Sequence, residues 1–228
     1  YFFELPGHGE SSKLRQPFTT ELIGAVVEQL VDHLGFARFN LMGFSFGGIL
    51  AMQAFLRLHA RIDRLMLIAP CLAGRAIKMS PIRRAAILSL AALLKHAPVQ
   101  KKVYTLLHNP PYNHYSASLL RRIGNVEETI SLDEVLKKVS PETLEVLTAQ
   151  IDESLSIDLP PPQQPFVTPC YFAMSTNDPL LDYRITVNTL QRFFARPSIT
   201  ELDYPFHQPP RPFTFDELNA GFRPTVNA

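Results

Sequence analysis

The stretch Gly43-Phe44-Ser45-Phe46-Gly47 comes directly after the apolar segment Phe39-Asn40-Leu41-Met42 and directly before apolar residues at helical spacing. A G-x-S-x-G pattern between a strand and a helix is typical of a sharp turn that exposes a serine nucleophile. Such a turn would strain Ser45 and crowd side chains two residues away, which explains the glycines at 43 and 47. The alternative is a glycine-rich turn whose serine only caps the following helix.

Strands and helices are expected to alternate around this turn. A helix over residues 22–34 has Thr19 or Thr20 ahead of it as a cap and Gly35 at its end, and a second helix follows Ser45. The expected strands lie at about 1–5, 38–43, 64–69, 169–174 and 199–203. Strands joined in this way by helices predict an α/β fold with a doubly wound, mostly parallel sheet.

Residues 73 to 165 show helical patterns and no convincing strand. Dense proline at 160–165 ends this region, because proline stops helices and stiffens the chain. We expect a core of residues 1–72 and 166–228, with residues 73–165 inserted as a helical cap. The expected helices of the insertion are 81–96, 99–107, 116–123, 131–138 and 141–152, and the core resumes with a helix at about 183–195.

The composition excludes several classes of protein. The 22 Lys and Arg residues nearly balance the 21 Asp and Glu residues and are scattered, so no basic surface is available for nucleic acid. The 46% of apolar residues suits a packed globule. The only cysteines, Cys71 and Cys170, lack metal-ligand spacing and are expected to be free thiols. The longest apolar run, residues 85–94, is shorter than the roughly 20 residues that a transmembrane helix needs.

Three segments together resemble the α/β-hydrolase superfamily, in the group that carries a helical cap. They are Leu5-Pro6-Gly7-His8-Gly9-Glu10-Ser11, similar to the turn after that family's fourth strand, the serine turn at 43–48, and Asn177-Asp178-Pro179 followed by His207. The resemblance extends from residue 1 to about 220. Its members carry nucleophile, acid and histidine in this order along the chain. The resemblance therefore implies a triad of Ser45, Asp178 and His207.

Asp178 and His207 each follow a predicted strand, at the end where ligands gather in α/β sheets. Asp178 could instead start a surface turn, and Asp182 is its nearest rival. The other histidines lie in turns, in helices or in the insertion: His8, His33, His59, His96, His108 and His114. The sequence departs from the family where Phe206 replaces the usual glycine before the histidine and Gln208-Pro209-Pro210 follows it. A loop of different shape is expected there.

The resemblance implies a serine hydrolase that acts on a carboxylic ester or thioester of a small apolar acyl group. His207 would take the proton of Ser45, Asp178 would hold the imidazole, and water would release the acyl-enzyme. The backbone N–H of Phe46 would hold the oxyanion, while Phe44 would either contact the acyl group or belong to the core. No metal or organic cofactor is expected. Acyl transfer, C–C bond hydrolysis and a non-catalytic binding role remain alternatives.

A second oxyanion donor normally comes from the loop after the family's third strand, and this sequence contains no such strand. A fragment or shortened chain is therefore expected. In it, residues 1–5 would either lie beside the strand at 38–43 or leave a gap with unpaired backbone groups. Tyr1 begins no recognisable signal peptide, so a cytoplasmic location is expected.

The expected helix at 81–96 is apolar nearly all round from Ile82 onward. A helix of this kind is buried or meets an apolar partner. Packing against the core and the other cap helices is one interpretation. An apolar substrate channel or a weak contact with a membrane surface is the other, and Arg83, Arg84 and Lys95 would suit lipid head groups.

Overall fold

The computed structural model describes residues 1–109, 112, 115, 118, 139–208 and 216. The chain divides into two compact units, of which the first comprises Tyr1–Phe18 and Met79–Asp152 and the second Thr19–Lys78 and Glu153–Ala228. These boundaries differ from the expected ones: Tyr1–Phe18 group with the helical residues, and residues 73–78 and 153–165, expected in the insertion, group with the second unit. That the helical residues form a cap over the serine stays a prediction.

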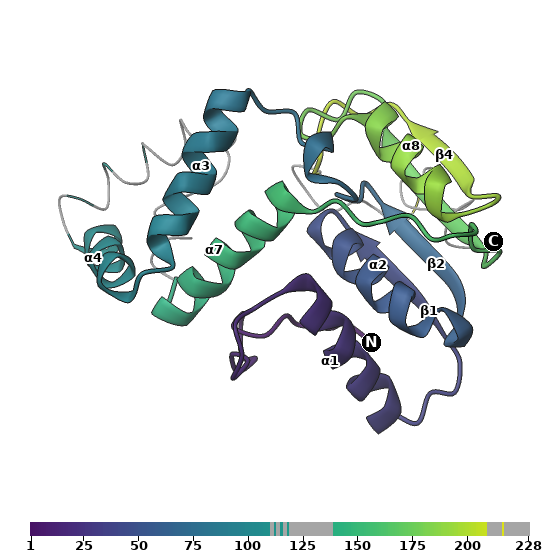
Figure 1. The fold of residues 1–228 in the computed structure, drawn as a ribbon, viewed down its shortest axis with the longest axis horizontal. Coiled ribbons are helices and arrows are strands. Elements are labelled where there is room, and N and C mark those ends of the chain that lie inside the picture. Colours follow the sequence, from purple (N-terminus) through teal and green to yellow (C-terminus); the bar gives the residue numbers. More distant parts are fainter. Residues whose placement is uncertain (110–111, 113–114, 116–117, 119–138, 209–215, 217–228) are drawn as a thin grey trace. The chain divides into compact units, whose positions relative to one another are not determined.

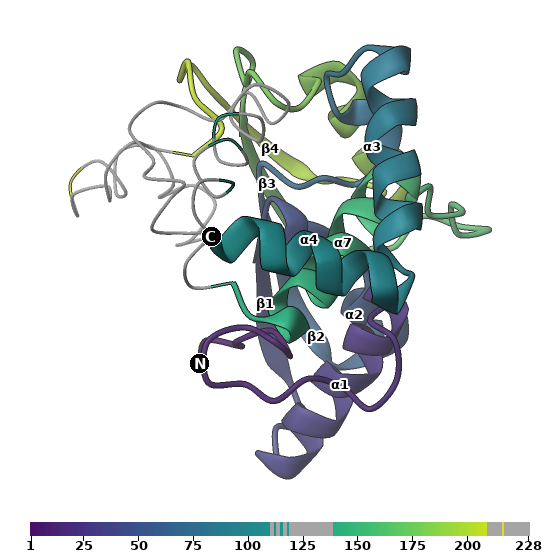
Figure 2. The same cartoon turned by 90° about the vertical axis from the view of Figure 1, so that its left-hand side faces the viewer.

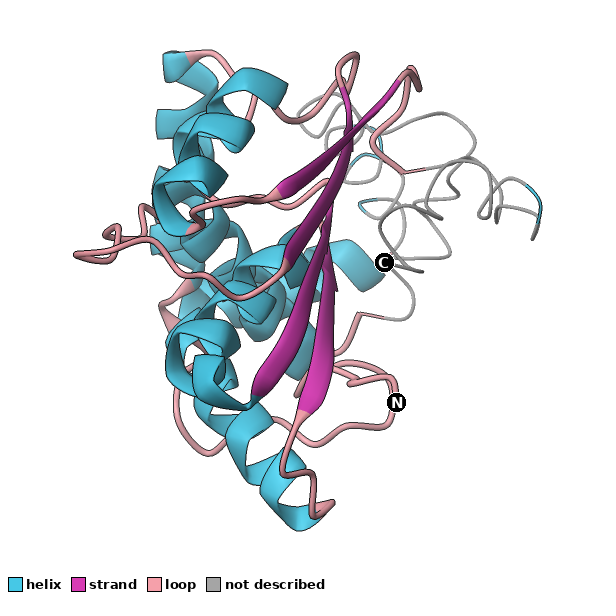
Figure 3. Cartoon of the chain, turned by 90° about the vertical axis from the view of Figure 1, so that its right-hand side faces the viewer, coloured by secondary structure: helices cyan, strands magenta, loops and turns pink. Residues whose placement is uncertain are grey.

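The second unit is built on a sheet of four parallel strands (Figures 1 and 3). The strands lie side by side in the order β1 (Phe39–Phe44), β2 (Ile62–Ile68), β3 (Cys170–Ser175) and β4 (Ser198–Leu202). They confirm four of the five predicted strands and the α/β class. Because the strands are parallel, the loops that follow β1, β3 and β4 meet at one edge of the sheet.

One face of this sheet is covered by α1 (Thr20–His33), α2 (Phe46–Leu58) and α8 (Tyr183–Phe193) (Figure 1). Leu65, Leu67 and Phe172 are fully buried on this face. Side chains alternate between the two faces of a strand, and on β1 the alternate residues Met42 and Phe44 are 54% and 41% exposed. The three helices confirm the predictions for this part of the sequence.

The strand predicted at residues 1–5 is wrong. These residues form no strand, and Tyr1 and Phe2 are almost fully exposed, at 96% and 103%. An apolar extended segment becomes a strand only when a neighbour completes its backbone hydrogen bonds. Within the described residues β1 pairs with β2 alone, so no described strand supplies that partner to residues 1–5.

The first unit contains the helical residues (Figure 2). Its described helices are α3 (Pro81–Leu94), α4 (Ala97–His108) and most of α7 (Pro141–Ser156). They confirm the helices predicted at 81–96, 99–107 and 141–152. The helices predicted at 116–123 and 131–138 lie outside the described residues, apart from residue 118.

The apolar helix α3 is only partly buried. Ile82 is 84% exposed and Leu93 is 54% exposed, while the Lys95 ammonium that follows the helix pairs with the Asp152 carboxylate of α7 at 2.5 Å. A contact of this helix with a membrane surface stays a prediction. Among the described residues, no helix is both long and apolar enough to span a membrane.

The ends of α1 follow the predicted chemistry. The Thr19 hydroxyl accepts a hydrogen bond from the Leu22 N–H at 3.1 Å, which satisfies one free donor of the first turn. At the other end, Gly35 adopts a φ of 69°, and its N–H donates to the Asp32 carbonyl at 3.0 Å. Glycine suits this position because it adopts left-handed backbone without steric cost.

A carboxylate also stabilises the start of α1. Glu153 accepts hydrogen bonds from the Thr20 N–H at 3.0 Å and from the Thr20 hydroxyl at 2.7 Å, and Thr20 is only 1% exposed. The negative charge faces the positive end of the helix dipole. This contact fixes the part of α7 that belongs to the second unit to the first turn of α1.

Replacing Glu153 with alanine is expected to lower the free energy of unfolding by about 1–3 kcal/mol, because two buried donors of Thr20 lose their acceptor. Denaturant titration of the purified full-length protein measures the change. Glu145→Ala is the matched control on the same helix, since Glu145 forms only an exposed pair with Lys13 and should cost less than about 1 kcal/mol. Equal losses in the two variants would contradict the proposed role of Glu153.

Candidate active site

The turn from β1 into α2 holds Ser45 in a strained conformation, with φ 51° and ψ −118°. Left-handed backbone at a residue other than glycine is uncommon and costs about 1–3 kcal/mol. Three backbone hydrogen bonds hold it: the Ser45 N–H donates to the Ile68 carbonyl at 3.0 Å, and the Ser45 carbonyl accepts from Gly48 at 2.9 Å and from Cys71 at 3.1 Å. The turn is therefore anchored to the end of β2.

Glycine is required at two positions of this turn because a side chain there would collide with neighbouring atoms. One of these two positions differs from the prediction. A Cβ atom at Gly43 would lie 2.3 Å from the Gly47 carbonyl oxygen, so glycine is needed there. A Cβ atom at Gly47 would meet nothing within 4 Å, which corrects the expected crowding at this residue. The second crowded position is Gly48, where a Cβ would lie 2.4 Å from Cβ of Pro70.

The structure brings Ser45, His207 and Asp178 together in one chain of hydrogen bonds. Nε2 of His207 lies 2.7 Å from the Ser45 hydroxyl, and Nδ1 lies 2.7 Å from Oδ2 of Asp178. Ser45 comes from the turn after β1, Asp178 from the loop after β3 and His207 from the loop after β4. These three loops meet because their strands are parallel.

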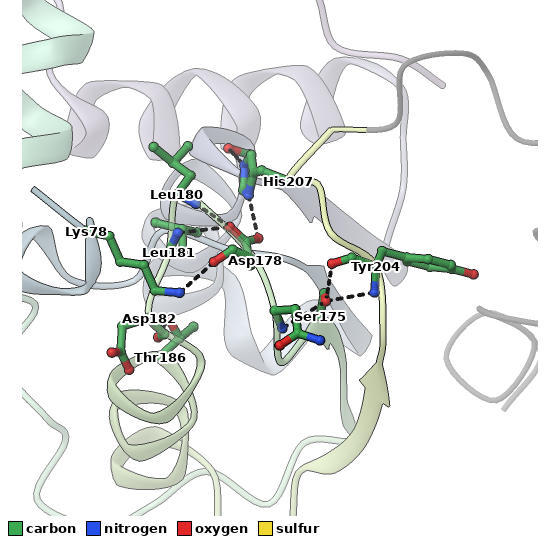
Figure 4. A network of polar contacts seen from close by, with 11 residues as sticks. Lys78, Ser175, Asp178, Leu180, Leu181, Asp182, Thr186, Tyr204 and His207 are labelled. Carbon is green, nitrogen blue, oxygen red and sulfur yellow. Dashed lines mark hydrogen bonds and ion pairs between the residues drawn. The ribbon is translucent and has the colours of Figure 1, made fainter. Parts of the chain in front are cut away.

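The Asp178 carboxylate is buried and fixed on both oxygens (Figure 4). It is 1% exposed, and Oδ1 accepts hydrogen bonds from the N–H groups of Leu180 at 2.8 Å and Leu181 at 2.9 Å. Oδ2 is left to face the His207 imidazole, whose side chain is 12% exposed. The Lys78 ammonium donates to the Asp178 backbone carbonyl at 2.6 Å and so steadies the same loop.

The sequence-based rivals have other roles. Asp182 caps α8, where its side chain accepts a hydrogen bond from the Ile185 N–H at 2.9 Å. The ring of His59 packs against Phe55 and Phe166, with ring centroids 6.3 and 5.1 Å apart. His114 lies outside the described residues.

Phe44 stacks on the imidazole of His207, with ring centroids 5.5 Å apart and an angle of 25° between the planes. The phenyl ring therefore lies against the histidine that faces Ser45, a contact that was not expected from the sequence. A contact of Phe44 with substrate and a role of the Phe46 N–H toward an oxyanion stay predictions.

The unusual residue before the histidine has a packing explanation. The Phe206 ring stacks on the Tyr204 ring with centroids 5.2 Å apart and planes within 7° of each other. Ser45 and Ala69 are the only described residues other than glycine with positive φ, so Phe206 needs no glycine-like backbone. The loop thus has an aromatic contact at the position where the family usually has glycine.

Cys71 and Cys170 form no disulfide, as predicted, and both side chains are buried. Burial raises the pKa of the Cys170 thiol well above its usual range, so the reactive thiolate is disfavoured. Among the described residues, no three His, Cys, Asp or Glu side chains gather in a way that could hold a metal ion.

The sheet is parallel, a strained serine lies at a strand-to-helix turn, and Asp178 and His207 follow later strands. These features define the class of α/β proteins that have a hydrolase-type nucleophile turn. A family model described as the α/β-hydrolase fold matches residues 1–104. The chain therefore has the α/β-hydrolase fold, and its first 104 residues are similar to that family.

Similar proteins agree with this assignment. The dihydrolipoyllysine-residue acetyltransferase component of the acetoin cleaving system of Pseudomonas putida is 38% identical over 74 residues, which are 32% of this chain and 20% of that protein. A putative acyltransferase from Salmonella enterica has a TM-score of 0.60 at 18% identity over 89% of this chain and 70% of that chain. An esterase from Exiguobacterium antarcticum has a TM-score of 0.58 at 14% identity over 97% and 77%.

The first two curated relatives are much longer than the part they share with this chain. The matched residues span 20% of one and 16% of the other. The two solved structures are 18% and 14% identical to the chain in sequence, so their similarity is one of fold alone.

Proposed function

We propose that the protein is a serine hydrolase that cleaves a carboxylic ester or thioester of a small apolar acyl group. The observation that carries this proposal is the hydrogen-bonded chain from the Ser45 hydroxyl through His207 to Asp178, at 2.7 Å for each link. A hydroxyl becomes a useful nucleophile when a base of this kind can take its proton. The base in turn needs a group that fixes its tautomer.

Each residue has a defined role in the proposed reaction. Nε2 of His207 takes the proton as the Ser45 oxygen attacks the carbonyl carbon, and it then gives that proton to the leaving alcohol or thiol. Asp178 accepts the Nδ1–H bond, which keeps Nε2 free to act as base and stabilises the imidazolium that forms. Water, deprotonated by His207, releases the acid and restores the Ser45 hydroxyl.

Negative charge develops on the substrate oxygen during each attack. We assign its stabilisation to the backbone N–H of Phe46 and to the positive end of α2, which begins at that residue. The loss of one such donor typically costs about 3 kcal/mol of transition-state stabilisation.

The exposed ring of Phe44 supports an apolar acyl group, and the similar structures leave the identity of the acyl acceptor open. Phe44 stays 41% exposed beside His207 and offers apolar surface to a bound acyl chain. Esterase and acyltransferase structures share the fold. Acyl transfer or C–C bond hydrolysis by the same three residues is therefore the second candidate, and a non-catalytic binding role is the third.

Hydrolysis of short-chain p-nitrophenyl esters by the full-length protein tests the proposal. Release of p-nitrophenol together with the free acid is expected, while a dominant acylated product in the presence of an added alcohol would favour the transferase. If the protein releases no p-nitrophenol and does not react with a fluorophosphonate probe, the binding role is favoured instead.

A further inference from the structure

The loops that carry Asp178 and His207 are joined by one buried hydroxyl. Ser175 is the last residue of β3 and is 5% exposed. Its hydroxyl accepts hydrogen bonds from the Asn177 N–H at 3.1 Å and the Tyr204 N–H at 2.9 Å, and it donates to the Tyr204 carbonyl at 2.6 Å (Figure 4). A serine hydroxyl has one donor and two acceptor positions. All three are therefore occupied.

These contacts lie next to the proposed acid and base. Asn177 directly precedes Asp178, and Tyr204 lies three residues before His207. One side chain therefore sets the start of both loops, although they are 29 residues apart in the sequence. The Asp178–His207 hydrogen bond closes the same ring of contacts at its far side.

The backbone N–H of Thr176 also donates to the Leu202 carbonyl at 2.9 Å, while the other side-chain contacts between the two segments are longer or more exposed. The Asn177 amide donates to the Asp203 carboxylate at the surface. The Thr176 hydroxyl lies 3.5 Å from the Leu202 carbonyl, at the limit of a hydrogen bond, and Thr176 is exposed. Among these side chains, Ser175 alone is buried.

We propose that Ser175 is a positioning residue, which holds the Asp178 loop and the His207 loop at the separation that their hydrogen bond requires. The inference rests on the proposed hydrolase function. Ser175 touches neither the nucleophile nor the reacting atoms, so it acts through the two loops. A displacement of about 1 Å at such a site can cost 100-fold in rate.

Kinetics of Ser175→Ala in the full-length protein tests the proposal. Without the hydroxyl, two N–H groups and one carbonyl lose a buried partner and the loops can separate. The expected result is a kcat about tenfold to 100-fold lower, with KM within about twofold of the wild type, since substrate contacts are unchanged. Thr176→Ala, the exposed hydroxyl one residue on, is the matched control and should keep the wild-type kcat.

Further variants separate positioning from folding. Ser175→Thr keeps the hydroxyl and should recover most of the activity, whereas Ser175→Cys keeps the approximate size but hydrogen-bonds weakly and should not. If Ser175→Ala does not fold, the comparison of kcat between Ser175→Thr and Ser175→Cys tests the positioning role. A wild-type kcat in folded Ser175→Cys or Ser175→Ala would overturn the proposal.

A measurement that needs no turnover distinguishes this proposal from the function on which it rests. The proton on Nδ1 of His207 should give a low-field NMR signal in the wild type, because it is held by Asp178. The signal should move upfield or vanish in Ser175→Ala and persist in Thr176→Ala. An inactive wild type would contradict the hydrolase, while an unchanged signal in Ser175→Ala would contradict the positioning role.

Discussion

Replacing Ser45 with alanine is expected to abolish labelling by a fluorophosphonate probe and to lower kcat for ester hydrolysis by about 10⁶-fold. The hydroxyl is the proposed attacking group, and His207 faces it at 2.7 Å. No other described serine is bonded to that imidazole in the structure. Labelling is followed on a gel, and the modified residue is located by peptide mass spectrometry.

The fold of the variant should persist, because alanine removes one oxygen atom and keeps the backbone bonds of residue 45 to Ile68, Gly48 and Cys71. Circular dichroism of the variant checks this. Ser80→Ala is a suitable control, since that hydroxyl caps α3 in the other unit and its loss should leave labelling intact. Probe attachment to Ser45→Ala at wild-type level would show that the nucleophile lies elsewhere.

Replacing Asp178 with asparagine should lower kcat by about 10⁴-fold while leaving the fold intact. The geometry explains why so small a change matters. Oδ1 of Asp178 faces the N–H groups of Leu180 and Leu181, so the asparagine amide would place its oxygen there and its NH₂ group toward His207. Nδ1 must then act as acceptor, and the proton moves to Nε2, where it blocks proton transfer from Ser45.

The matched control is Asp182→Asn, which alters an aspartate four residues further along that caps α8. It should reduce stability slightly and leave kcat within about twofold of the wild type, because it does not contact the imidazole. Steady-state kinetics of both variants on the same p-nitrophenyl ester separates the two aspartates. Comparable losses of kcat in both would remove the assignment of Asp178 as the orienting acid.

Local patterns predicted most of the second unit. The serine turn is recognisable because strand, small residues and helix are adjacent in the sequence, and the helix caps at Thr19 and Gly35 depend on neighbouring residues only. Asp178 and His207 were predicted from the resemblance to the family, and the position of Asp178 at the end of a strand favoured it over Asp182. Whether these residues catalyse a reaction stays a proposal.

The features that sequence reasoning missed depend on contacts between distant segments. Residues 1–5 have the composition of a strand, but no strand in the described part of the chain pairs with them. Gly48 is crowded by Pro70, 22 residues away, so no local pattern reveals it. Ser175 and Lys78 act on loops 29 and 100 residues distant. A polar residue that ends the apolar stretch 170–174 was the only available signal for Ser175.

The backbone at Ser45 has a consequence for engineering. A residue with φ 51° has a strained backbone, so substitutions that relax the turn would raise the melting temperature while moving the proposed nucleophile away from His207. Selection for a higher melting temperature alone would therefore favour variants that lack the proposed activity. A stabilisation campaign on this protein should exclude residues 43–48 and screen every library for turnover as well as for melting.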